Sequence, residues 1–233
     1  MNVLDIIDSN AMNSASLIRA HDLKNRRKYP YLPTRIIDNF FEAPMGWRAF
    51  ALDQQYEKCS DGTWPGERSQ PLNDLDNNMF EVFAKKLLEA VPEYVGFTNL
   101  RAQFHLVDGS YIKGWVHDDD PTLNIVGVIY LNKDAPLGTG TTIYNDKYDQ
   151  NADTYREYFK KDVLFSTPES RANLSNIRDE HRSKFTPNME IQNVFNRCVI
   201  YDPRLWHSPD NYFGTTKEDS RLTLVFFAKG QKK

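Results

Sequence analysis

The feature that most constrains the fold is a change in hydrophobic pattern near Gly96. Before this point, apolar residues repeat at helical spacing in two segments, one opened by Pro44 and a clearer one between Met79 and Val91. After it, apolar and polar residues alternate in short runs separated by turn residues. The runs expected to form strands are 100–107, 111–119, 124–132, 138–144, 191–195, 197–202 and 221–228. This order predicts a mainly β fold with flanking helices and a jelly-roll core, with an open α+β sheet as the alternative.

The strand pattern is interrupted once, by a polar segment at about 145–188. It carries eight basic and eight acidic residues, which favours a folded helical insertion over a charged tail. The segment leaves the predicted core after Tyr144 and returns before Ile191. A connection of this kind should emerge near the open mouth of the core, so we expect a mobile lid over the substrate entrance.

Length and composition favour one domain. With 233 residues, of which 40% are hydrophobic, the chain can bury a substantial core. We expect residues 1–96 to form an N-terminal arm and helices packed on a core of residues 97–233. The net charge of −3 does not indicate a nucleic-acid or membrane partner. Two cysteines, no bilayer-length apolar run and no secretion signal lead us to expect a cytoplasmic protein.

Three residues in or near the predicted strands are candidate metal ligands. Residues i and i+2 of a strand point to the same face, so His117 and Asp119 should point together. His207 follows the predicted strand 197–202 and supplies a second imidazole. Two histidines and one carboxylate with open positions favour non-haem Fe(II), although Zn(II) binds the same ligands. We therefore predict a catalytic metal site formed by His117, Asp119 and His207.

A buried cation is predicted in the same core. Arg221 opens the apolar strand 221–228, and an inward arginine there needs a partner because an unpaired buried charge costs several kcal/mol. A carboxylate co-substrate would satisfy its guanidinium through two parallel hydrogen bonds. Thr223 shares the strand face of Arg221. Asn124 has the strand parity of Tyr130 and is a further candidate for contact with the co-substrate or substrate.

The order and spacing of these residues resemble the Fe(II)- and 2-oxoglutarate-dependent oxygenases, especially their prolyl-hydroxylase-like branch. The similarity covers roughly residues 97–229. It is carried by the segments Phe104…Asp119, Ile129–Asn132, Gly138–Thr142, Cys198–His207 and Arg221–Thr223. The segment Trp64–Arg68 resembles a small bacterial and phage group of this superfamily.

The resemblance implies a double-stranded β-helix that binds Fe(II) through His117, Asp119 and His207. It implies that Arg221 pairs with the distal carboxylate of 2-oxoglutarate. Tyr130 and Thr223 match positions whose hydroxyl groups can bind the same carboxylate. The implied activity is that of a dioxygenase, which consumes O₂ and 2-oxoglutarate, releases succinate and CO₂, and hydroxylates a substrate.

Two other functions remain open from the residues alone. One is a non-catalytic β-helix binding module that retains the metal ligands, and the other is a cupin-like zinc enzyme, which would not need Arg221. The expected lid favours a peptide or protein side chain as the substrate, with a free amino acid or other small molecule next. Nucleic acid is disfavoured, because its binding needs clustered Lys and Arg.

Overall fold

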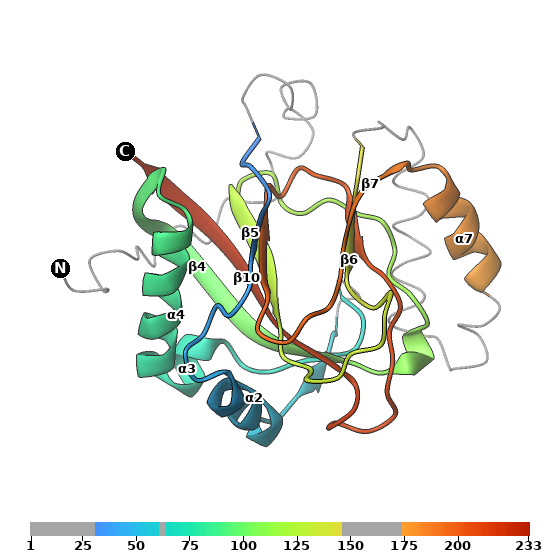
Figure 1. Cartoon of the computed structure of the whole chain (residues 1–233), viewed down its shortest axis with the longest axis horizontal. Coiled ribbons are helices and arrows are strands. Elements are labelled where there is room, and N and C mark those ends of the chain that lie inside the picture. The colour runs from blue at the N-terminus through green and yellow to red at the C-terminus, as the bar shows by residue number, and fades with distance from the viewer. Residues whose placement is uncertain (1–30, 61–63, 146–173) are drawn as a thin grey trace.

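The computed structural model describes residues 31–60, 64–145 and 174–233, and its centre is a pair of antiparallel sheets (Figure 1). The larger sheet has the strand order β1-β8-β5-β10-β4-β3-β2, and the smaller has the order β7-β6-β9. The strands are β1 Arg35–Ile37, β2 Glu57–Lys58, β3 Glu67–Arg68, β4 Tyr94–Val107, β5 Ile125–Tyr130, β6 Thr141–Tyr144, β7 Pro187–Ile191, β8 Cys198–Tyr201, β9 His207–Pro209 and β10 Arg221–Lys232. The helices are α2 Pro44–Asp53, α3 Leu72–Leu75, α4 Asn77–Ala90, the 3₁₀ turn η3 Gly109–Tyr111, and α7 Ser175–Ser183. The predicted mainly β fold with flanking helices is confirmed.

Helices α2, α3 and α4 pack on the outer face of the larger sheet (Figure 1). Helix α4 begins at its N-cap Asp76, whose side chain accepts a hydrogen bond from the amide of Met79, and Pro92 follows its end. Its buried face includes Phe83, whose ring lies 5.3 Å from that of Phe226 on β10. The helical spacing of apolar residues in the sequence therefore corresponds to the face that contacts the sheet.

The inner face of the larger sheet is defined by the register of its central strands. Thr223 on β10 pairs with Tyr130 on β5 and with His105 on β4, so these side chains point to one side. Tyr130 packs in a second apolar cluster with Ile143 of the smaller sheet. The side that carries Thr223 therefore faces the smaller sheet.

Several predicted element boundaries differ from the structure. The segment 111–119 is no continuous strand: Ile112 has a φ of 63°, and only Lys113 and His117 form isolated bridges. Strand β7 begins at Pro187 and ends at Ile191, so 192–195 are outside it. The expected 96/97 boundary falls inside β4, and the N-terminal part contributes strands β1–β3 as well as helices.

The described part of the 145–188 insertion does not lie over the space between the sheets. Helix α7 packs beside β6 and β7, outside the smaller sheet (Figure 1). Phe185, just after this helix, contacts the rings of Tyr144 and Trp206. Residues 174–188 therefore pack on the smaller sheet, 146–173 lie outside the described residues, and the lid stays a prediction. No helix in the described part has the length and apolar character needed to cross a bilayer.

The core between the helices and the larger sheet predicts a large stability cost for truncating Phe226. This side chain is fully buried, and Phe226→Ala should lower the free energy of unfolding by about 3–5 kcal/mol through lost burial and the resulting cavity. Urea denaturation measures the change. Leu137 is 88% exposed, so Leu137→Ala serves as the control and should change stability by less than about 0.5 kcal/mol. Equal effects of the two substitutions would contradict this description of the core.

Candidate metal centre

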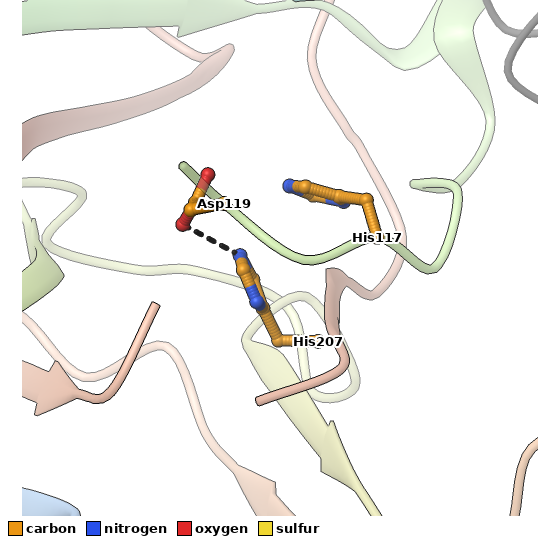
Figure 2. Close-up of side chains that lie close together, drawn as sticks. All are labelled: His117, Asp119 and His207. Carbon is orange, nitrogen blue, oxygen red and sulfur yellow. Dashed lines mark ion pairs between the residues drawn. The ribbon is translucent and has the colours of Figure 1, made fainter. Parts of the chain in front are cut away.

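His117, Asp119 and His207 converge on one point between the sheets (Figure 2). Their candidate ligand atoms all lie within 4.8 Å of one another. Nε2 of His207 is 3.4 Å from Oδ2 of Asp119, and the two imidazole rings are 4.3 Å apart between centroids. The spacing of these residues in the sequence therefore predicted a real spatial cluster.

Backbone hydrogen bonds bring the three residues together. The amide of His117 donates to the carbonyl of His207 at 2.9 Å, and the reverse bond is 2.8 Å long. The amide of Asp119 donates to the carbonyl of Pro203 at 2.8 Å. The segment 117–119 is thus fixed against residues 203–207, which lead into β9.

Each histidine is oriented by a carbonyl group in its own segment. Nδ1 of His117 lies 2.9 Å from the carbonyl oxygen of Trp115, and Nδ1 of His207 lies 2.9 Å from that of Leu205. A carbonyl oxygen only accepts hydrogen bonds, so Nδ1 carries the proton in both rings. The lone pair of Nε2 is then available to a metal ion, in the arrangement typical of metal-ligating histidines.

The electrostatics of the centre favour metal binding. His207 is buried, and its burial together with the neighbouring His117 lowers its pKa to about 4. The imidazole is therefore neutral near pH 7, which is the form that binds metals. His117 is exposed and Asp119 is half-buried, so the centre is accessible to solvent on their side.

The donor set fits Fe(II). Two imidazoles and one carboxylate offer three ligand atoms, which leaves positions for other ligands. This is the ligand set expected from the sequence, and the tautomers fixed by Trp115 and Leu205 strengthen the fit.

Arg221 is a buried cation that forms no ion pair with a carboxylate in the described part of the chain. Its side chain is 2% exposed, and its hydrogen bond in the described part of the chain runs from Nε to the carbonyl of Thr139 at 3.3 Å. The guanidinium lies between the rings of Tyr130 and Tyr212, at 5.6 and 5.9 Å from their centroids. Because no described carboxylate forms an ion pair with it, this arginine is suited to an anionic ligand.

The two predicted hydroxyl groups lie on the face that carries Arg221. Thr223 is two residues along β10, and Tyr130 pairs with it across the sheet. The Tyr130 hydroxyl donates to Oγ1 of Thr141 at 2.7 Å, so its proton is already used. The Thr223 hydroxyl makes only a long contact of 3.5 Å with the carbonyl of His105, so it can turn toward a ligand.

Asn124 lies away from the other predicted residues. Its side-chain amide donates to the carbonyl of Gly230 and accepts from the amide of Gly230, at 3.2 and 2.7 Å. Its own backbone amide bonds the carbonyl of Ala228, at the end of β10 remote from Arg221. Strand parity placed Asn124 on a face but could not say at which end of the sheet it lies. Its side chain is used in hydrogen bonds to the backbone of β10 at Gly230.

Sequence reasoning missed two groups that support the centre. Tyr212 flanks Arg221 and makes an edge contact with Tyr111. Its position five residues after His207 was the one feature of the sequence that could have suggested a place near the site. Arg182 of α7 donates to the carbonyl of Gly114 and to Oγ of Ser208, both at 2.8 Å. Arg182 therefore connects the segments that lead to the two histidine ligands, from outside the smaller sheet.

Comparison with known proteins supports the fold. The model of a family of unknown function, DUF6445, matches residues 24–228. The chain is similar to a prolyl hydroxylase from Trichoplax adhaerens, solved with a hypoxia inducible factor oxygen degradation domain peptide fragment, at 10% identity and a TM-score of 0.51, with 84% of this chain and 83% of that chain covered. It is also similar to HygX from Streptomyces hygroscopicus, solved with nickel, 2-oxoglutarate and hygromycin B, at 11% identity and a TM-score of 0.52, with 84% and 82% covered. No curated protein sequence matches the chain.

These similarities confirm the double-stranded β-helix fold that the sequence resemblance implied. Both solved structures cover more than four fifths of the chain. At this level of sequence identity, what is shared is the fold.

The low pKa of His207 predicts that the metal-free protein loses stability in mild acid. Above its ordinary pKa of 6.5, His207 is neutral in both the folded and the unfolded chain. Between pH 6.5 and about 4, the unfolded chain binds a proton that the folded chain excludes. The free energy of unfolding should therefore fall by up to roughly 3 kcal/mol over this range through this residue alone.

Urea denaturation of chelator-treated protein at several pH values measures this slope. The buried His105, whose pKa burial also lowers well below its ordinary value, should add a loss of the same sign. His207→Gln should remove the His207 share and flatten the profile. An unchanged profile in that variant would contradict the assignment.

Proposed function

The chain belongs to DUF6445, a family of unknown function, and we propose that it is an Fe(II)- and 2-oxoglutarate-dependent dioxygenase. One observation carries the proposal: the fold of these oxygenases holds both a His-Asp-His cluster and a buried arginine that no described carboxylate pairs with. A metal site alone would fit many reactions. The buried arginine adds the specific requirement for an anionic ligand, which 2-oxoglutarate satisfies.

The iron would be held by Nε2 of His117, Nε2 of His207 and a carboxylate oxygen of Asp119. Trp115 and Leu205 keep the two imidazoles in the required tautomer through their carbonyl groups. When bound, iron with O₂ and 2-oxoglutarate supplies the oxidative chemistry, with succinate and CO₂ as products. The protein fixes the geometry of the ligands and orients the substrate.

Arg221 would bind the distal carboxylate of 2-oxoglutarate. A guanidinium in a buried site forms strong, directional hydrogen bonds with a carboxylate. Thr223 can donate a hydrogen bond from its hydroxyl group. Tyr130 can do so only after its hydrogen bond to Oγ1 of Thr141 is broken. The rings of Tyr130 and Tyr212 exclude water around the cation, which strengthens its interaction with the carboxylate.

We propose a hydroxylated product and leave a small molecule and a peptide as the two substrate classes. The solved structures that share the fold were determined with one of each, a peptide fragment and hygromycin B. The lid that favoured a peptide is not formed by residues 174–188. A nucleic-acid substrate has no support, because the net charge is −3 and such binding needs clustered positive charge.

Substitution of the metal ligands should abolish both iron binding and turnover. His207→Ala removes one imidazole, and Asp119→Asn weakens the carboxylate ligand. We expect no succinate from 2-oxoglutarate in either variant, and greatly reduced Fe(II) binding by anaerobic titration. Asp118→Asn makes the same chemical change one residue away and should retain both properties. Full metal stoichiometry in His207→Ala would show that the iron site is elsewhere.

Removal of Arg221 should act on 2-oxoglutarate and not on iron. Arg221→Gln should raise the KM for 2-oxoglutarate by roughly 30- to 4,000-fold, because a charge-assisted bond in a buried site is lost. Tyr130→Phe should have a smaller effect of about fivefold, the value of one ordinary hydrogen bond. Succinate release at varied 2-oxoglutarate concentration measures both. If the KM of Arg221→Gln equals that of the wild type, the co-substrate assignment fails.

A further inference from the structure

A second arginine points into the space between the sheets. Arg68 on β3 pairs with His105 on β4, and His105 pairs with Thr223 on β10. Directly paired residues share a face, so Arg68 lies on the inner face that carries Thr223. Asp119 acts on Arg68 electrostatically by raising its pKa. This arginine therefore belongs to the surroundings of the metal centre.

The Arg68 guanidinium has no protein partner among the described residues. Within the described part of the chain it forms no ion pair or hydrogen bond, and its Nε atom is buried without an acceptor. It stacks over the ring of Trp64 at 4.3 Å and lies 5.7 Å from that of Phe227. Burial and the nearby Arg101 lower the pKa of Arg68 to about 10, so it stays charged at neutral pH. Holding such a charge without an acceptor is costly.

Two other buried polar atoms around it also lack partners. Among the described residues, Nε1 of Trp64 has no acceptor and Oε1 of Gln103 has no donor, although Nε2 of Gln103 donates to the carbonyl of Ser69. Gln103 is two residues from His105 on β4, so both side chains point to the same face. Unsatisfied buried polar atoms are uncommon in folded proteins. A cluster of two donors and one acceptor indicates a ligand with complementary groups.

We propose that Arg68 and Trp64 bind a carboxylate of the substrate, and that Gln103 accepts a hydrogen bond from a neighbouring donor group of the same molecule. A small carboxylic acid with an adjacent N–H donor, such as an amino acid, has these groups. The inference rests on the proposed oxygenase function and names its substrate class. When iron is bound, the charge of Asp119 is shared with the metal, and Arg68 is left for an external anion.

The segment that carries these residues is held rigidly. Gly66 has a φ of 69°, and a Cβ there would lie 2.3 Å from the carbonyl oxygen of Leu106. Only glycine lets the chain approach β4 this closely. His105, kept neutral by its burial and by Arg68, donates from Nε2 to the carbonyl of Pro65 at 2.6 Å. Trp64 and Arg68 lie on either side of Pro65 and Gly66, the two residues held against β4. Their positions are therefore fixed, as a binding subsite requires.

Arg68 and Arg221 are suited to different carboxylates. Arg221 lies at the start of β10, opposite Val107, whereas Arg68 lies two strands away, opposite His105. Arg221 is enclosed by Tyr130 and Tyr212. Arg68 stacks between Trp64 and the half-buried Phe227. The two guanidinium groups stack on different rings, so substitution of one arginine leaves the stacking partners of the other in place.

The test uses calorimetric titration of the full-length protein loaded anaerobically with Fe(II) and 2-oxoglutarate. The probes are free L-amino acids, the same compounds as carboxamides, and terminally blocked peptides that contain Asp or Glu. We expect a free acid to bind, and we expect the affinity of its amide to be lower by a factor of roughly 30 or more. Binding of blocked acidic peptides alone would assign the carboxylate to a side chain of a peptide substrate.

Variants assign the effect to Arg68. Arg68→Gln should lose roughly 30-fold in affinity for the acid and abolish the difference between acid and amide, because both changes remove one interaction. Arg68→Lys should retain part of that difference. Trp64→Phe keeps the ring and removes the N–H donor, with an expected loss of about fivefold. Arg35→Gln removes the same charge from β1, at the opposite edge of the sheet, and should bind like the wild type.

The inference is overturned if no carboxylate probe binds, if Arg68→Gln keeps its preference for the acid, or if that variant loses affinity for 2-oxoglutarate instead. Failure of the wild type to bind Fe(II) and 2-oxoglutarate would count against the oxygenase function. The acid and amide titrations are then made on the metal-free protein, where dependence on Arg68 still decides the subsite.

Discussion

The centre depends on one reciprocal backbone bridge between His117 and His207. Two hydrogen bonds, of 2.9 and 2.8 Å, connect segments that are far apart in the sequence. His207 begins β9, which pairs with β6, so the bridge also attaches the segment 113–119 to the smaller sheet. Arg182 and the amide of Asp119 secure the two sides of this junction. The bridge lies at the two histidines themselves, and it therefore sets the position of His207 relative to His117 and Asp119.

The sequence predicted well what depends on local spacing. The buried position of Arg221 followed from its place at the start of an apolar strand and from the cost of burying an unpaired charge. His117, Asp119 and His207 do lie together, although 117–119 is not the regular strand from which the shared direction of His117 and Asp119 was predicted. Asn124 could not be placed, because parity assigns a face and not a position along the sheet. Arg68 was missed as a site residue because its direction depends on the pairing of the two-residue strand β3 with β4. No periodicity is visible in so short a strand.

The insertion shows how a polar segment can form part of a packed structure. Its charges balance, which predicted a folded helical insertion, and its place between two predicted strands of the core suggested a lid. In the described portion, His181 and Phe185 pack with Trp115 and Trp206, and Arg182 is used for hydrogen bonds to the smaller sheet. Helix α7 thus completes a second, outer layer on this side of the molecule, opposite the layer formed by α4 (Figure 1). Both sheets are supported from outside.

The orientation of the two imidazoles has a consequence for the order of folding and metal uptake. Each ring is held by a carbonyl group two residues earlier in its own segment, so neither depends on the other or on the ion for its direction. The conformational entropy of both rings is lost when the chain folds, and none of it needs to be lost again when the ion arrives. Under the proposed function, metal loading would be a late, reversible step on a preorganised receptor, unlike in small zinc domains, where the ion drives folding.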